Sequence, residues 1–418
     1  MKITKIAAAM LLGGVATAVM MGQANALEAQ AFADRIIEVY KTIGYDVTLG
    51  EATLDGDTIT IDGGSITVVS TPEAPMETMT FDTELTFSGV VENADGSYMA
   101  ESLTIPDIDT DFAEEPAGHL SLVDIRVDGF YLPAGNPVPA IGLMQLYENF
   151  STGALSITRD GEEVISIDSI QAGSTFNPQH GATELTDLTS NFAVNNITAD
   201  LSTVSEEDPS AGAVIEALGL TSITGNITGD LSWSMADGHM TVHEFLLDFA
   251  DVGALNITTD ISGFTPAVLD QIYAMQGAMT AGGEMTEEQS QAQMMQGMAI
   301  MQGVSIIGAS VRYDDAGLAP KLLDFFASSS GADRATFVEG IKAMLPGMIA
   351  ETGIPALNDV IVPPVSAFLD DPKSLEVKIA PPSPTSLLVL MAAAANPPGL
   401  ISALGLAVEA NTAAPAAD

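Results

Sequence analysis

The chain has 418 residues, of which 47% are hydrophobic, and its 56 acidic residues against 12 basic ones give a formal net charge of −44. This charge excludes nucleic acid and anionic membrane surfaces as partners, because both bind through clustered Lys and Arg. The hydrophobic content excludes a disordered polyanion. Because the chain has no Cys, burial rather than disulfide bonding must stabilise its fold.

The first 26 residues are expected to be a cleavable secretory signal peptide. Lys2 and Lys5 precede an apolar run over 6–21, and Ala24-Asn25-Ala26 supplies the small residues that a signal peptidase accepts. The apolar run is shorter than the roughly 20 residues that a membrane-spanning helix needs. We therefore expect a bacterial protein that is periplasmic or secreted, with no transmembrane segment after signal cleavage.

An N-terminal helix and a long β-rich region follow. The periodicity of 27–43, with Gly44 as its stop, predicts an amphipathic helix over 27–44. From 45 to 265 apolar and polar residues alternate, which predicts antiparallel strands with one wet face. Asp-Gly dipeptides punctuate this region and favour tight hairpin turns. These dipeptides are Asp55-Gly56, Asp62-Gly63, Asp95-Gly96, Asp128-Gly129, Asp160-Gly161 and Asp237-Gly238.

A seven-residue phrase recurs within the β-rich region at a constant interval. It begins at Asn196, at Asn226 and at Asn256, and each copy opens with Asn-Ile-Thr. In each copy Asn, Thr, Asp and Ser share one strand face, while Ile, a small residue and Leu or Ile share the other. Equivalent strands repeated in this way predict an extended sheet in which neighbours complete one another's apolar face.

Beyond residue 265 the pattern becomes mostly helical. A capping hydroxyl before Pro266 and a capping box at Thr286 and Gln289 predict two helices, which form a Met-rich hairpin over 266–303. The range 304–411 is predicted to be an α+β region, and 412–418 a disordered tail. The fold class is therefore α+β: an extended, twisted antiparallel sheet built from hairpins and repeats of about 30 residues, with an N-terminal helix and a mostly helical C-terminal region.

Three groups of side chains are candidate metal ligands. Asp107, Asp109 and Asp111 alternate on one strand, so their carboxylates form a candidate Ca²⁺ site, or else a solvated surface. The Met-rich hairpin offers thioethers for Cu(I), or else core packing or an adaptable apolar groove. His239 and His243 would share a strand face and form a metal pair, or else remain surface residues.

The leading functional hypothesis is a non-catalytic envelope protein. The chain has no Cys nucleophile, no Gly-x-Ser-x-Gly elbow and no nucleotide-binding Gly-rich loop, so we expect neither an enzyme nor a bound cofactor. A one-sided sheet covered by Met-rich helices is expected to bind a lipid-like apolar ligand or an envelope protein partner. The alternative hypothesis is a Ca²⁺- or Cu(I)-binding periplasmic module. The residues expected to line the groove are Met79, Phe81, Leu85, Phe87, Ile227, Leu231, Trp233, Met294 and Met298.

The Asp-Gly-turned amphipathic strands and recurring Ile-Thr-x-Asp-Leu phrases resemble repetitive bacterial envelope proteins of the AsmA-like kind. The resemblance is one of texture and covers roughly residues 45–265. It implies a long β-sheet whose apolar concave face handles lipid, and a role in envelope maintenance. The chain departs from that family in its expected lack of a retained N-terminal membrane anchor. No site residue is carried over from the family.

Overall fold

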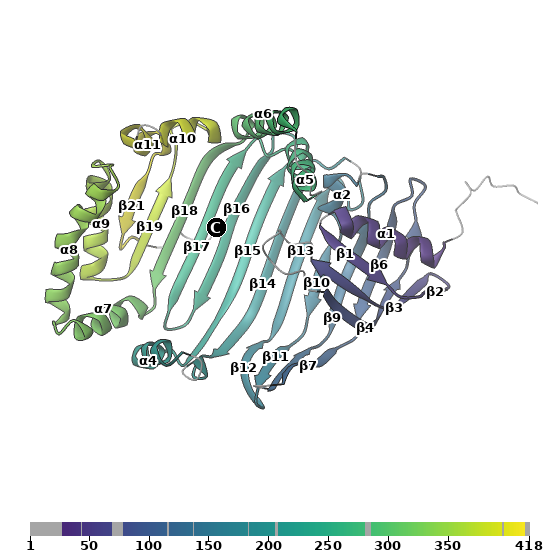
Figure 1. Ribbon diagram of the computed structural model, residues 1–418, viewed down its shortest axis with the longest axis horizontal. Coiled ribbons are helices and arrows are strands. Elements are labelled where there is room, and N and C mark those ends of the chain that lie inside the picture. The colour runs from purple at the N-terminus through teal and green to yellow at the C-terminus, as the bar shows by residue number, and fades with distance from the viewer. Residues whose placement is uncertain are drawn as a thin grey trace, which may run out of the picture.

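The computed structural model describes residues 27–413 apart from 43, 69–77, 115–116, 137, 183, 205–207, 281–285 and 395–396. The expected signal peptide and residues 414–418 of the expected tail lie outside this range. The described chain forms a large open sheet of antiparallel strands with helices along its borders (Figure 1). The predicted α+β class with an extended antiparallel sheet is confirmed.

The N-terminal helix closes one end of the sheet. Helix α1 (Ala29–Thr42) is amphipathic, and its apolar stripe packs on the strands, where the Phe32 ring meets the Phe87 ring edge-on at 4.9 Å. The chain turns away after the helix at Gly44, whose φ of +91° is adopted readily by glycine alone. The buried residues of α1 are Phe32, Ala33, Ile36 and Val39.

The main body of the sheet pairs antiparallel throughout. Its longer strands are β1 (Tyr45–Leu49), β3 (Thr58–Val68), β4 (Thr78–Ser88), β6 (Tyr98–Ile105), β9 (Ile125–Leu132), β10 (Asn149–Thr152), β13 (Ser169–Asn177), β14 (Asp187–Asp200), β15 (Ser222–Ser234), β16 (His239–Phe249), β17 (Gly253–Ser262), β18 (Ser305–Asp315), β19 (Ser374–Ile379) and β21 (Ala407–Ala410). They pair in the order given, each with the next. The short strands β2 (Ala52–Asp55), β5 (Val91–Glu92) and β20 (Thr385–Ser386) add to β3, β6 and β18.

A four-stranded branch leaves the sheet at β14. It consists of β7 (Ile108–Glu114), β8 (Ala117–Leu122), β11 (Leu155–Arg159) and β12 (Glu162–Ile167), paired in that order. Strand β14 pairs with β13 as far as Asn195, and beyond that point it pairs with β12. The branch and β13 therefore lie beside successive parts of one long strand.

The recurring phrase lies on β14, β15 and β17, all within one sheet. The first two copies meet directly, because the backbone N–H of Asn196 donates to Oδ1 of Asn226 at 2.9 Å. Strand β16 separates the second copy from the third. The three Ile side chains of the phrase nevertheless point to the same face. Ile197 lies opposite Gly225, which is two residues before Ile227 on the same strand. Ile257 is two residues after Leu255, which lies in the same cross-strand row as Ile227.

The helices lie along the borders of the sheet in Figure 1. Their bounds are α2 (Ala140–Leu143), α4 (Pro209–Leu218), α5 (Pro266–Thr280), α6 (Glu287–Gly303), α7 (Leu318–Ser329), α8 (Arg334–Glu351), α9 (Leu357–Asp370), α10 (Leu387–Ala394) and α11 (Pro397–Leu404). The predicted capping box before α6 is confirmed, since Thr286 and Gln289 cap each other's backbone. Helices α6, α10 and α11 follow one border, α4 and α7 the opposite one, and α8 and α9 the β21 side.

Two apolar clusters form the core, and both lie toward the N-terminal end of the sheet. The first lies between α1 and the strands from β3 to β9, with Phe87 2% exposed at its centre. The second surrounds Trp233, which is also 2% exposed and is joined by residues of α2, α5 and the loop before α5. The indole N–H of Trp233 donates to the carbonyl of Phe264 at 2.7 Å, so the only polar atom of this side chain is satisfied.

Candidate functional site

One face of the sheet is apolar across its central strands. Ile227 of β15 lies opposite Val194 of β14 and Leu247 of β16, and the row continues through Leu255 of β17 to Tyr313 of β18. Directly opposite residues of antiparallel strands project to the same side. A second row joins Ile257, Val311, Val377 and Val408 on β17, β18, β19 and β21. The alternation seen in the sequence thus produces one continuous apolar surface.

Most of this surface is not covered by the described helices, although at its β18 side the Phe368 ring of α9 meets the Tyr313 ring with centroids 6.4 Å apart. Val311 is 45% exposed and Val377 is 39% exposed, and the other members of the two rows are half-buried. In Figure 1 the centre of the sheet, from β14 to β18, is free of helices, which lie instead around its margin. We call this surface the open apolar face. It comprises Val194, Ile227, Leu247, Leu255, Ile257, Val311 and Val377.

Two glycines of β15 allow aromatic rings to lie close to the backbone on this face. A Cβ at Gly229 would lie 2.1 Å from Cε1 of Phe192, so the Phe192 ring lies flat over the glycine. The ring of Phe249 covers Gly225 in the same way. Phe192 and Phe245 then approach with ring centroids 6.0 Å apart. These rings spread over the backbone and widen the apolar surface beside Ile227.

The residues expected to line a groove are dispersed in the structure. Ile227 lies on the open apolar face. Phe87 and Trp233 fill the two cores and are inaccessible, and Leu85 and Leu231 pack against them. The side chains of Met79 and Phe81, on β4, lie outside the described atoms.

The expected Met-rich cover does not lie over the open apolar face. Met294 and Met298 are 61% and 41% exposed on α6, which runs along the border of the sheet. The sequence analysis missed Val194, Leu247, Leu255, Val311 and Val377. Their period-two alternation carries the signal that would have found them.

Two of the three Asp residues of the predicted Ca²⁺ site share His119 as a partner, and the third has a different one. Asp111 lies 2.9 Å from Nδ1 of His119 and Asp109 3.4 Å from Nε2 of the same ring. Asp107 instead accepts the backbone N–H of Asp124 at 2.9 Å. Within the ranges that the structure describes, no three His, Cys, Asp or Glu side chains are grouped so as to hold a metal ion.

The two histidines of the candidate metal pair also have separate partners. Nε2 of His239 lies 2.6 Å from Oδ1 of Asp260, and Nε2 of His243 lies 2.8 Å from Oγ of Ser232. Both rings lie on the opposite, polar face of the sheet. The two imidazoles therefore join neighbouring strands, His239 linking β16 to β17 and His243 linking β16 to β15.

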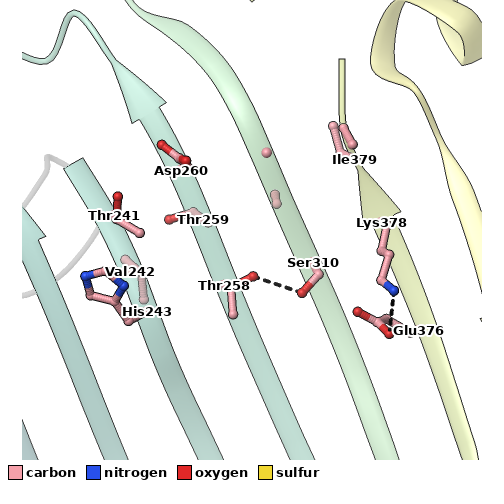
Figure 2. A pocket seen from close by; sticks show the side chains of 13 residues that line it. Thr241, Val242, His243, Thr258, Thr259, Asp260, Ser310, Glu376, Lys378 and Ile379 are labelled. Carbon is pink, nitrogen blue, oxygen red and sulfur yellow. Dashed lines mark hydrogen bonds and ion pairs between the residues drawn. The ribbon is translucent and has the colours of Figure 1, made fainter. Parts of the chain in front are cut away.

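The polar face is internally hydrogen-bonded. A hollow of about 380 Å³ lies over β16–β19. Thr258 and Ser310, which line it, share a hydrogen bond of 2.9 Å between their hydroxyl oxygens, drawn as a dashed line in Figure 2. Nζ of Lys378 lies 3.2 Å from Glu376 and 3.0 Å from Glu409. The polar groups of this hollow that pair in the structure bond either to one another or to residues beside it, as His243 does with Ser232 and Asp260 with His239.

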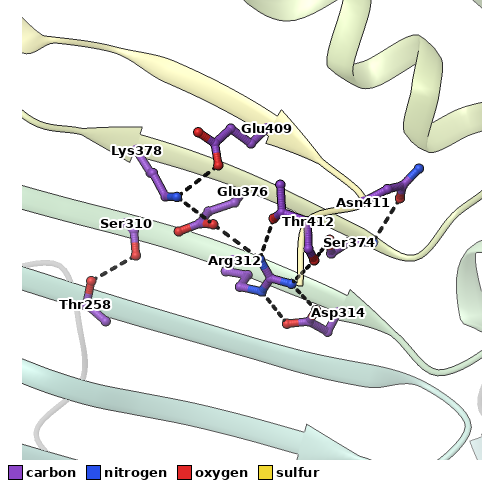
Figure 3. A network of polar contacts seen from close by, with 10 residues as sticks. All are labelled: Thr258, Ser310, Arg312, Asp314, Ser374, Glu376, Lys378, Glu409, Asn411 and Thr412. Atoms are coloured by element: carbon purple, nitrogen blue, oxygen red, sulfur yellow. Dashed lines mark hydrogen bonds and ion pairs between the residues drawn. The ribbon is translucent and has the colours of Figure 1, made fainter. Parts of the chain in front are cut away.

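A buried arginine anchors the C-terminal segment to the polar face (Figure 3). The Arg312 side chain is 4% exposed and pairs with Asp314 at 2.6 Å and with Glu376 at 3.3 Å. It also donates to the hydroxyl and the carbonyl of Thr412 at 2.9 and 2.8 Å. The hydrogen bond with Asp314 raises the pKa of Arg312. The guanidinium therefore fixes the C-terminal segment at Thr412 to the sheet.

Comparison with known proteins adds little about function. The sequence model of a family described only as "Uncharacterized protein" matches residues 246–411, a range that includes β17–β21 and the C-terminal helices. No curated protein matches the chain. None of the helices in the described ranges combines the length and the hydrophobicity needed to cross a membrane.

Proposed function

We propose that this is an exported, non-catalytic envelope protein that holds the alkyl chain of an uncharged or zwitterionic amphiphile against its open apolar face. The observation that carries the proposal is the uncovered pair of rows around Ile257, with Val311 and Val377 exposed. Six neighbouring strands, at ~4.8 Å spacing, make this surface ~24 Å across. Contiguous apolar patches of this kind mark interaction sites on soluble proteins.

Charge decides between an amphiphile and other occupants. A second copy of the chain would bring another formal charge of −44 toward the first, and like charges at an interface oppose association. Anionic lipids and fatty acid carboxylates are disfavoured for the same reason. A neutral or zwitterionic head group carries no such penalty. The resemblance to AsmA-like envelope proteins is compatible with this class of ligand and is part of the proposal.

The strength of binding should depend on chain length. Burying one methylene completely contributes about 0.8 kcal/mol, and an alkyl chain lying on an open face is buried on one side only, so each methylene contributes ~0.4 kcal/mol. The loss of translational and rotational freedom costs at least ~4 kcal/mol. Short alkyl chains therefore bind too weakly to detect, and four added methylenes strengthen binding by ~1.6 kcal/mol, or slightly more than tenfold.

For a sixteen-carbon chain these figures leave only ~2.4 kcal/mol, a dissociation constant of ~20 mM. The test is therefore ligand-observed NMR of dodecyl- and hexadecylphosphocholine below their micelle concentrations in the presence of the exported protein, because this measurement detects weak binding. We expect the longer chain to bind about tenfold more tightly, and Val311→Asp to abolish binding because it places a carboxylate under the alkyl chain. The matched control is Ser310→Asp, which adds the same charge one residue away on the polar face and should leave binding unchanged. Equal affinities for the two lengths, or equal effects of the two substitutions, would contradict the proposal.

A further inference from the structure

Two segments in the C-terminal half of the chain carry no charged residue. The sequence has none between Glu288 and Arg312 and none between Lys378 and Glu409, whereas 16% of the whole chain is charged. The first segment contains all of α6 beyond its first turn, and the second contains α10 and α11. These three helices therefore lack the acidic residues that give the protein its formal charge of −44.

The fold brings the two segments together on one border of the sheet. Helix α10 contacts both α6 and α11, and all three helices lie along the same margin in Figure 1. Strand β20, which leads directly into α10, pairs with the start of β18, which follows α6. The surface of α10, α11 and α6 beyond its first turn is therefore one uncharged border on an otherwise acidic protein.

The apolar side chains of the uncharged border face solvent. Helix α6 is 17 residues long and has no buried residue. Its Met294, Met295 and Met298 are 61%, 60% and 41% exposed, and Val389 and Met391 on α10 are 53% and 55% exposed. Helix α10 consists of Leu, Val, Met and Ala alone, so none of its sides offers a polar side chain to water. Contiguous apolar exposure of this kind marks an interaction surface.

Charge and side-chain type favour a lipid bilayer as the partner of this border. A second copy of the chain would bring another charge of −44, which opposes association. Neither uncharged segment contains the Trp, Tyr or Arg anchors that dominate protein interfaces. A bilayer requires only aliphatic contacts, and α10, with eight residues, is ~12 Å long and would lie in the interfacial plane. Because the border has no Lys or Arg, it has no attraction to anionic lipid.

We propose that the uncharged border docks on a membrane surface composed mainly of zwitterionic lipid, with the exposed side chains of α6 and α10 inserted between head groups and acyl chains. Docking of this border and binding of an alkyl chain on the open apolar face are separate properties. The two surfaces nevertheless adjoin. Ile261 lies four residues after Ile257 on β17, hence on the same face, and pairs with Ile306 beside β20. A docked border therefore places one end of the open apolar face at the lipid surface.

The first test uses the absence of Cys, which allows an environment-sensitive fluorophore to be attached at one chosen residue of the full chain. Met391→Cys reports from the uncharged border, and Met348→Cys, at a position 61% exposed on α8, is the matched control. With phosphatidylcholine vesicles we expect emission from position 391 to shift to shorter wavelength and emission from position 348 to stay unchanged. Replacing part of the lipid with phosphatidylglycerol should weaken binding severalfold at low salt.

The second test is vesicle flotation of charge-adding variants. Val389→Asp combined with Met391→Asp should weaken binding to phosphatidylcholine vesicles at least ~tenfold, because carboxylates are costly to bury among acyl chains. Met344→Asp combined with Met348→Asp adds the same charges on α8 and should leave flotation unchanged. All four positions are more than half exposed, so both variants are expected to fold, and a thermal melt of each checks this.

Val311→Asp separates this proposal from alkyl binding on the open apolar face. It should leave flotation unchanged although it abolishes binding of single alkylphosphocholines, so either property can fail without the other. A fluorophore at position 391 that does not respond overturns membrane docking, as do equal effects of the two double substitutions, a loss of flotation in Val311→Asp, or tighter binding to phosphatidylglycerol. A dimer in light scattering that Val389→Asp with Met391→Asp dissociates overturns it in favour of self-association.

Discussion

Removing the buried guanidinium of Arg312 should destabilise the protein far more than removing an exposed cation of the same kind. Arg312→Leu leaves Glu376, itself 6% exposed, with Lys378 as its only remaining cation at 3.2 Å. Deleting one partner of a buried ion pair costs about 3–5 kcal/mol. The two lost hydrogen bonds to Thr412 each contribute about 1 kcal/mol. We therefore expect Arg312→Leu to lower the free energy of unfolding by about 6 kcal/mol, the middle of the combined range of about 5–7 kcal/mol.

The measurement is urea unfolding followed by circular dichroism, with a double-mutant cycle. Glu376→Leu leaves Arg312 paired with Asp314 and should cost about 2 kcal/mol, and the double variant should cost less than the sum by about 1–2 kcal/mol because the two side chains are coupled. The control is Lys373→Leu, which breaks an ion pair with Asp371 whose side chains are 66% and 64% exposed and should cost less than about 1 kcal/mol. Equal losses for Arg312→Leu and Lys373→Leu would refute the reasoning.

Three further substitutions test other features of the fold. Gly225→Ala should destabilise the protein by about 1–3 kcal/mol, because the new Cβ would lie 2.3 Å from the Asp248 carbonyl oxygen. Gly297→Ala, in an open position on α6, should instead stabilise the protein by about 1 kcal/mol. Chemical denaturation that gave the same sign for both variants would be inconsistent with these expectations. Hydrogen bonds from the Ser97 side chain and backbone lower the pKa of Asp95, so its contribution is present above pH ~3.9 and is lost as the pH falls through the lower folded pKa. Asp95→Asn should accordingly flatten the acid limb of the stability profile, and an unchanged limb would count against these bonds. Burial raises the pKa of Tyr313, and a hydrogen bond to Asp315 adds to the shift. The contribution of the neutral phenol to the free energy of unfolding is therefore present below pH ~10 and is lost as the pH rises above it. Tyr313→Phe should reduce alkaline destabilisation in a pH series of thermal melts, and an unaltered series would contradict the raised pKa.

Local signals in the sequence were sufficient for most helix ends. The range 27–44, predicted as a helix, contains α1, and the Thr286–Gln289 capping box begins α6 where expected. Caps act within one turn of the backbone and need no information from elsewhere in the chain.

The Asp-Gly dipeptides show where local reasoning is insufficient. Those at 55–56, 95–96, 160–161 and 237–238 lie between paired strands, as predicted. The prediction of a turn was wrong at Asp62-Gly63 and Asp128-Gly129, which lie inside β3 and β9. Gly63 and Gly129 have φ of +66° and +64°. A positive φ of this kind closes a hairpin when it lies between two strands, but it kinks the strand when it lies inside one. At Gly63 the kink coincides with a shift of register. Only the position of the partner strand distinguishes the two uses.

The distinction between core and open surface is likewise a tertiary property. Phe87 and Ile227 have the same alternating neighbours in sequence, yet one is sealed by α1 and the other lies on uncovered sheet. Helix α1 seals the end of the apolar surface around Phe87, and α9 contacts its other side at Tyr313, with ring centroids 6.4 Å apart, while the strands between β14 and β19 continue the pattern. The formal charge of −44 opposes the approach of two like-charged sheets before their apolar faces meet, which disfavours pairing of this surface with another copy. A protein that retains an apolar surface and opposes self-association in this way is suited to a ligand without net charge.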